Sequence, residues 1–236
     1  MAYIINIETA TEVCSVSVAN DNDIIFYREE TAGPSHATLL GTYVDEAVRF
    51  LREKNIAPDA VAVSCGPGSY TGLRIGVSEA KGVCYGYSIP MIAIKTLEVI
   101  SKAALMSSAT SIEKATLLCP MIDARRMEVY DAIYNTQLNE LKPTSADIID
   151  EHSFSEILDS NKVAFFGNGS AKCKDVITHN NAIFIDGVYP SAAAMVPLST
   201  EAYEQKKFVD SAYFEPFYLK DFVATIPKNK VLNSNS

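Results

Sequence analysis

The order in which apolar runs follow one another constrains the fold of this chain more than any other feature of its sequence. Three short runs rich in β-branched residues come first and are joined by tight links, so they predict an antiparallel meander. Two further apolar runs, each suited to a buried strand, alternate with three helical patterns, which gives the order β-β-β-α-β-α-β-α. The predicted strands are 3–8, 13–19, 24–30, 60–65 and 89–94, and the predicted helices are one that Ser35 caps, one at 70–85 and one at 96–106.

The same order begins again beyond residues 106–114, a stretch of small polar side chains that predicts a linker. The repetition lies in the order of the elements and not in residue identity. Pro197 falls inside the last helical pattern and predicts that this helix is distorted or shortened. The predicted strands of this half are 117–123, 128–134, 146–149, 163–167 and 182–185, and the helices lie near 154–158, 171–178 and 192–203.

This duplicated order predicts an α/β fold built from two related β-β-β-α-β-α-β-α subdomains. We place the first subdomain at residues 1–106 and the second, more degenerate one at 115–205. We expect a further segment, 206–226, to pack back on the body, and the polar tail at 227–236 to be disordered.

Acidic residues outnumber basic ones, which limits the partners of the isolated chain. The formal net charge is −9, from 20 Lys and Arg against 29 Asp and Glu. A free-standing nucleic-acid-binding domain usually presents a basic face, so RNA contact would need a local patch or a partner. No apolar run approaches the ~18 residues of a membrane helix, and the first residues lack the basic stretch of a signal peptide. We therefore expect a cytoplasmic protein without membrane contact.

The five cysteines and three histidines argue against a disulfide framework or a metal site. The cysteines are widely spaced, odd in number and never in a CxxC pattern, and most lie in apolar runs, which predicts buried thiols. No two histidines have the spacing that places both imidazoles on one metal. We expect neither a metal nor a cofactor.

The segment GPGSYTG at residues 66–72 predicts a tight turn into the second helix. Backbone N–H groups at that helix start could hold an anion, but the lysine of a phosphate-binding P-loop is missing. Ser69 would act as a nucleophile only beside a base, and the sequence shows none.

Five distinctive motifs are spread over nearly the whole chain. The most specific of them is GPGSYTGLRIG at residues 66–76. The others are INIETAT in the first strand, MIDARRMEVY at 121–130, GNGS at 167–170 and EPFYLK at 215–220. Together they resemble the bacterial TsaB (YeaZ) family, whose fold is the duplicated one of the actin-like ATPases.

The resemblance implies a non-catalytic subunit of the machinery that makes threonylcarbamoyladenosine next to the tRNA anticodon. It implies pairing with a TsaD homologue, the metal-bearing paralogue that performs the transfer, in a complex that a TsaE-type ATPase joins. It further implies a homodimer in the absence of TsaD, and contact with tRNA only through the complex.

The resemblance also implies the positions of a vestigial nucleotide site. Glu8 and Thr9 stand where the family usually has Asp and Thr, followed by a serine. The glutamate side chain is one methylene longer than aspartate, and Mg²⁺ demands near-ideal octahedral geometry, so this replacement is not a neutral one at a magnesium site. Asp123 opens the second hairpin, where an Asp-x-Gly pattern becomes Asp-Ala-Arg. Gly167 and Gly169 lie where a turn would contact adenosine, although a plain turn has the same pattern. These departures argue against ATP hydrolysis and leave weak nucleotide binding open.

Arg125 and Arg126 form the only adjacent arginine pair in the sequence. They could meet a phosphate of tRNA or of a nucleotide. A surface ion pair with Asp123 or Glu128 is the simpler expectation.

The second helix contains or borders three glycines, at positions 76, 82 and 86. Glycine in a helix interior costs about 0.5–1 kcal/mol relative to alanine, so we expect something to pack closely against this helix. One explanation is the chain's own sheet. The resemblance implies another, because in this family the first two helices form a helical bundle with TsaD. The residues then expected to face the partner are Leu39, Tyr43, Phe50, Leu73, Arg74, Gly76, Val77 and Ala80.

A stand-alone enzyme with this fold is the alternative of a different class: a small-molecule kinase, an ATPase or a peptidase. Such an enzyme needs metal ligands, or a nucleophile with a base, and the sequence displays neither pattern. A plain homodimer with an unrelated binding role is a third interpretation.

Overall fold

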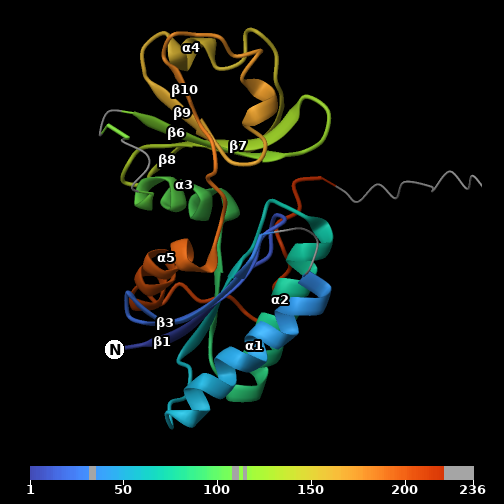
Figure 1. Cartoon of the computed structure of the whole chain (residues 1–236), viewed down its shortest axis with the longest axis vertical. Helices are drawn as coiled ribbons and strands as arrows, with labels where there is room; N and C mark the ends of the chain where they lie inside the picture. Colours follow the sequence, from blue (N-terminus) through green and yellow to red (C-terminus); the bar gives the residue numbers. More distant parts are fainter. Residues whose placement is uncertain (32–35, 108–111, 114–115, 221–236) are drawn as a thin grey trace, which may run out of the picture.

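Each half of the chain forms one five-stranded sheet, as the computed structural model in Figure 1 shows. The structure describes residues 1–31, 36–107, 112–113 and 116–220. The predicted cap Ser35, most of the predicted linker and the predicted disordered tail fall outside these residues. We call the part of the molecule around the first sheet the first lobe and the part around the second sheet the second lobe.

The first sheet contains the predicted antiparallel meander, extended by two parallel strands, in the order β3-β2-β1-β4-β5. Its strands are β1 (Tyr3–Glu8), β2 (Cys14–Asn20), β3 (Asp23–Glu30), β4 (Ala60–Ser64) and β5 (Met91–Ile94). Two long helices, α1 (His36–Glu53) and α2 (Tyr70–Tyr87), cover one face and bury Val16 and Val18 of β2. Val16 and Val18, two positions apart along β2, therefore point to the same face of the sheet.

The opposite face of the first sheet is covered by α5 (Ala192–Glu204), which follows the second sheet in sequence. Ser15 and Ser17, the polar positions of β2, hold the start of this helix. Ser15 Oγ accepts a hydrogen bond from Ala192 N at 2.8 Å, and Ser17 Oγ donates one to Ala192 O at 3.0 Å. Ser15 thus satisfies the N–H of Ala192, one of the donors that a helix start leaves without an intrahelical partner, and the hydrogen bond from Ser17 holds the same residue in place.

The second sheet repeats the plan of the first, in the order β10-β9-β6-β7-β8. Its strands are β6 (Leu117–Asp123), β7 (Glu128–Tyr134), β8 (Glu140–Ile148), β9 (Val163–Phe166) and β10 (Ala182–Ile185). One face packs on α3 (Thr96–Met106), which lies between the two sheets and also contacts α5. The other face is covered by α4 (Ser155–Leu158) and the segment around Cys173 and Ile177.

Three element predictions for the second half need correction. The helix expected at 171–178 is only a short 3-10 turn, Ala171–Cys173, and the residues after it keep Ile177 buried in the same cluster as Cys173 without continuing the helix. The third strand is not confined to 146–149 but begins at Glu140, since an edge strand tolerates Pro143. Pro197 does not shorten α5, which runs its full 13 residues with the proline inside.

The cysteines behave largely as buried thiols. All five are unpaired; Cys14, Cys84, Cys119 and Cys173 are buried, and Cys65 is half-buried. Burial holds the pKa of the Cys119 thiol well above its usual value, which keeps it protonated and unreactive. Among the described helices, none has the length and apolar character needed to cross a bilayer.

Candidate functional site

A cleft of about 680 Å³ lies where the turns of the two hairpins meet the start of α2. Most of its lining residues come from four places in the sequence. They are the first hairpin turn at 10–12, the GPGSYTG turn, the second hairpin turn at 123–125 and the C-terminal residues 217–220. The motifs that carry the resemblance thus meet around one cavity.

Glu8 is fully buried and does not line this cleft. Its Oε1 accepts hydrogen bonds from Ala10 N at 2.7 Å and from Ser64 Oγ at 2.9 Å, while Oε2 has no partner among the described residues. Burial raises the pKa of this carboxyl to about 7, and the hydrogen bonds from Ala10 and Ser64 only partly offset that rise. Glu8 therefore fixes the hairpin turn instead of presenting a carboxylate to a ligand.

Thr9 is also buried and joins the hairpin to α2. Its Oγ1 donates a hydrogen bond to Gly72 O at 2.8 Å. A Cβ atom on Gly76 would lie 2.3 Å from the same Oγ1. Close packing on the chain's own first hairpin, one of the two explanations for the helix glycines, therefore accounts for Gly76.

The GPGSYTG turn is shaped by the same hairpin. A Cβ on Gly68 would lie 2.3 Å from Ala10 O, and Ser69 N donates a hydrogen bond to that oxygen at 2.7 Å. The Ser69 side chain accepts a hydrogen bond from Gly72 N at 3.2 Å and so caps α2. Ser69 has the role of a helix cap here and not the setting of a nucleophile.

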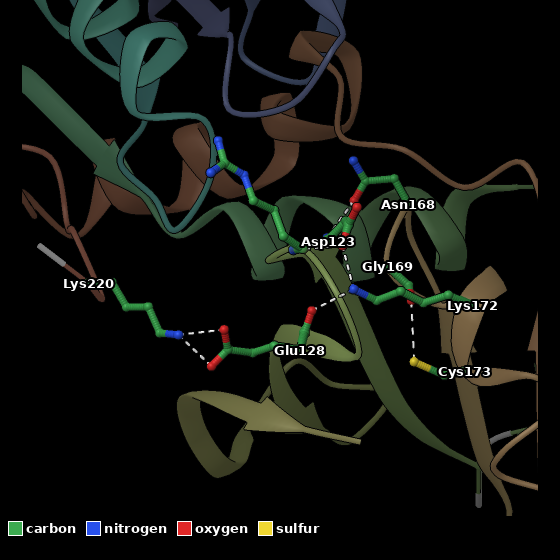
Figure 2. Close-up of polar contacts among 8 residues, drawn as sticks. Asp123, Glu128, Asn168, Gly169, Lys172, Cys173 and Lys220 are labelled. Atoms are coloured by element: carbon green, nitrogen blue, oxygen red, sulfur yellow. Dashed lines mark hydrogen bonds and ion pairs between the residues drawn. The ribbon is translucent and has the colours of Figure 1, made fainter. Parts of the chain in front are cut away.

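Asp123 reaches the cleft but is already neutralised, as Figure 2 shows. Its Oδ1 forms an ion pair with Lys172 Nζ and accepts a hydrogen bond from Arg125 N at 2.9 Å. Lys172 Nζ also donates to Glu128 O at 2.6 Å. Lys172 thus supplies the positive charge beside the Asp123 carboxylate. The two residues are 49 positions apart in the sequence, so this contact could not be predicted from the sequence.

Asn168 connects the two lobes across the cleft, a role that the sequence did not reveal. Its Oδ1 accepts a hydrogen bond from Asp123 N at 3.0 Å, and its Nδ2 donates one to Glu12 Oε2 at 2.9 Å. The glycines that flank it have packing roles. A Cβ on Gly167 would lie 2.3 Å from Met121 O. A Cβ on Gly169 would lie 2.8 Å from the carbonyl carbon of Ile122. The plain-turn interpretation accounts for both glycines.

Arg125 and Arg126 do not form the expected ion pairs with Asp123 or Glu128. Asp123 is paired with Lys172, and Glu128 is paired with Lys220 from the C-terminal segment. Both arginines adopt left-handed backbone, with φ of 71° and 50°, at the tip of the second hairpin. Their side chains have no ion-pair partner within the described part of the chain.

These side chains do not fit a magnesium nucleotide. The carboxyl on the first hairpin is buried and turned to its own backbone, and the one on the second is paired with an ammonium group. Within the described ranges, no cluster of three or more His, Cys, Asp or Glu side chains is placed to hold a metal ion. The geometry shows a hydrogen-bonded cluster of turns between the lobes.

Half of the residues expected to face a partner are buried in the first lobe. Leu73, Gly76, Val77 and Ala80 lie on the face of α2 that packs against the chain itself, so the prediction is wrong for them. Their apolar spacing marked the inner face of the helix and not the outer one. The other four residues are Arg74, which is exposed, and Leu39, Tyr43 and Phe50, which are half-buried.

The outer face of α2 carries a different set of residues, Arg74, Ser78, Gly82 and Tyr85, which we call the docking face. Tyr85 is 90% exposed. Neither Gly82 nor Gly86 would bring a Cβ within 4 Å of any other group, so no internal contact explains these two glycines. The glycines at positions 82 and 86 were the sequence signal for this face, although neither was among the residues expected to face a partner.

Matches to known proteins extend over most of the chain. The family model described as TsaD, tRNA N6-adenosine threonylcarbamoyltransferase, matches residues 29–228. The Escherichia coli K12 protein named tRNA threonylcarbamoyladenosine biosynthesis protein TsaB is 30% identical over 228 residues, covering 94% of this chain and 96% of the relative. The chain belongs to the TsaB (YeaZ) family. A Haemophilus influenzae TsaB is 28% identical over 231 residues, 92% of this chain and 93% of its own length.

Solved YeaZ structures share the fold. YeaZ from Pseudomonas aeruginosa superposes with a TM-score of 0.75 at 24% identity, over 93% of this chain and all of that one. A second Pseudomonas aeruginosa structure, described as similar to peptidase YEAZ, gives 0.76 at 23% identity and the same coverage. The actin-like α/β architecture predicted from the duplicated element order is confirmed.

Proposed function

We propose that this chain is a non-catalytic subunit in threonylcarbamoyladenosine biosynthesis that acts by docking on a TsaD homologue. Support comes from the TsaB relatives, which carry the name of that pathway and match almost the whole chain. The turns around the cleft support the non-catalytic part of the proposal, because the two carboxyl groups of the expected nucleotide site, Glu8 and Asp123, are occupied by internal contacts. Contact with tRNA then belongs to the assembled complex, in keeping with a net charge of −9.

The outer face of α2 is the observation that carries the docking proposal. A helix that keeps Gly82 and Gly86 in open space gives up stability in the isolated chain, about 0.5–1 kcal/mol for each glycine relative to alanine. That cost is offset where a partner helix approaches more closely than a side chain would allow. The exposed Tyr85 beside the glycines is an anchor of the kind found at the centres of protein interfaces.

The same face serves a homodimer when the partner is absent, so the two assemblies compete for it. ATP hydrolysis in the complex is then the task of the TsaE-type subunit. The domain limits proposed from sequence, 1–106 and 115–205, remain a proposal, with the addition that α5 lies on the first sheet.

A pair of measurements on the purified chain tests this function. Isothermal titration should show binding to the TsaD homologue of the same organism, with the homodimer dissociating as the heterodimer forms. The chain alone, incubated with Mg²⁺ and ATP, should release no phosphate above a buffer control. Sustained ATP turnover by the isolated chain would contradict the proposal and favour the stand-alone enzyme.

A further inference from the structure

The C-terminal segment at residues 208–220, which we call the strap, forms a second wall beside the docking face. Val209 N donates a hydrogen bond to Met91 O at 2.9 Å, which holds the start of the strap to the edge of the first sheet. Phe217 N donates to Cys65 O at 2.7 Å, which holds its end at the GPGSYTG turn. Between these points the strap runs along the flank of α2.

A pocket of about 280 Å³ lies between α2 and the strap. Arg74 and Ser78 of the docking face line it, so a partner lying on that face would cover its mouth. The remaining walls are apolar and aromatic, apart from Lys81 and Glu215. The full lining is Tyr70, Arg74, Val77, Ser78, Lys81, Phe214, Glu215, Pro216 and Tyr218.

Two cations border the pocket without a carboxylate partner in the described residues. Arg74 lies over the Tyr70 ring, 5.2 Å from its centroid, and donates to the Tyr70 hydroxyl at 2.8 Å. Tyr70 packs in turn on Tyr218, with ring centroids 4.8 Å apart, so the guanidinium is held in place by stacked rings. Lys81 Nζ donates only to Ala212 O, at 3.4 Å.

The balance of charge at the pocket is opposite to that of the whole chain. Arg74 and Lys81 lie two helical turns apart, about 10 Å along α2. Glu215 is the one carboxylate in the lining, and it forms no ion pair with either cation. The pocket therefore carries a net positive charge on a chain whose net charge is −9.

We propose that this pocket receives an acidic side chain of the protein that docks on α2. The inference rests on the docking role proposed above and adds the chemistry of the contact. A carboxylate seated between Arg74 and Lys81 would be shielded from water by the Tyr70 and Tyr218 rings, and such charge pairs fix the register of an interface. The partner is therefore expected to present an Asp or Glu side chain next to an otherwise apolar helix that packs closely on α2.

Charge reversal tests the pocket. Arg74→Glu and Lys81→Glu should each weaken binding to the purified TsaD homologue at least tenfold in isothermal titration. The salt dependence of the remaining affinity should become shallower, because an attractive pair has been removed. Lys174→Glu, an exposed cation on the second lobe, is the matched control and should bind within twofold of the wild type. All three variants should keep the wild-type melting temperature within 2 °C, roughly the effect of a surface change.

The outcomes separate this inference from the docking proposal. Wild-type affinity in both reversals, together with loss of binding in Gly82→Leu, would overturn the pocket and leave the docking face standing. Wild-type affinity in Arg74→Glu, Lys81→Glu and Gly82→Leu alike would overturn both the pocket and the docking face. Reversals that abolish self-association in sedimentation but leave the heterodimer intact would assign the pocket to a second copy and contradict the inference.

Discussion

Gly82→Leu should abolish pairing with the TsaD homologue while making the isolated chain more stable. Position 82 is exposed, and the Cβ of the added side chain lies more than 4 Å from every group outside the adjoining helix backbone. Leucine is a better helix former than glycine by about 0.5–1 kcal/mol, so the free energy of unfolding should rise by that amount. In a close helix-helix contact the same side chain has no room. We expect the dissociation constant measured by titration to rise at least a hundredfold.

The control for this variant is Glu201→Leu, an exposed position on α5 at the opposite face of the first sheet. It adds a comparable apolar side chain away from the docking face and should bind normally. Wild-type affinity in a Gly82→Leu chain shown to be folded would place the interface elsewhere.

Glu8→Gln should stabilise the chain at neutral and alkaline pH and do little at acid pH. The folded state raises the pKa of Glu8 from 4.5 to about 7, so it favours the protonated form. The stability that this preference contributes is complete below about pH 4.5 and is lost as the pH rises through 7. Glutamine keeps the acceptor oxygen for Ala10 and Ser64 and never ionises. The variant should therefore gain up to about 3 kcal/mol over the wild type by pH 8.

Urea unfolding at pH 5, 6, 7 and 8 measures this difference. Glu12→Gln removes the same formal charge from an exposed position on the same hairpin and should show no comparable rise with pH. A wild type and a Glu8→Gln chain whose stabilities stay parallel from pH 5 to 8 would show that Glu8 is ionised in the fold.

Much of the fold could be predicted because its signals are local. The β-branched runs predicted the meander, and the repeated order of elements predicted the second sheet. What the sequence concealed are contacts between distant positions. Ser15 and Ser17 bind the start of α5, some 175 residues away, and nothing near them in the sequence indicates that contact. Apolar spacing shows that a face is buried and not which element buries it.

The candidate site shows the same limit. The replacement of the usual aspartate by Glu8 was visible in the sequence, but the turn of that carboxylate toward Ala10 and Ser64 depends on the folded hairpin. The pairing of Asp123 with Lys172 joins a hairpin to a distant turn. The glycines of α2 combine two roles on one helix: Gly76 packs inward on Thr9, whereas Gly82 faces outward. Only the three-dimensional structure separates the inner face from the outer one.

Reconstituted threonylcarbamoyl transfer, with this chain omitted or added back, tests the central claim most directly. The account predicts that transfer to tRNA requires the chain, that a Glu8→Gln and Asp123→Asn double variant supports it as well as the wild type, and that Gly82→Leu does not. Full transfer without the chain, or loss of transfer in the double variant despite normal pairing with the TsaD homologue, would contradict it.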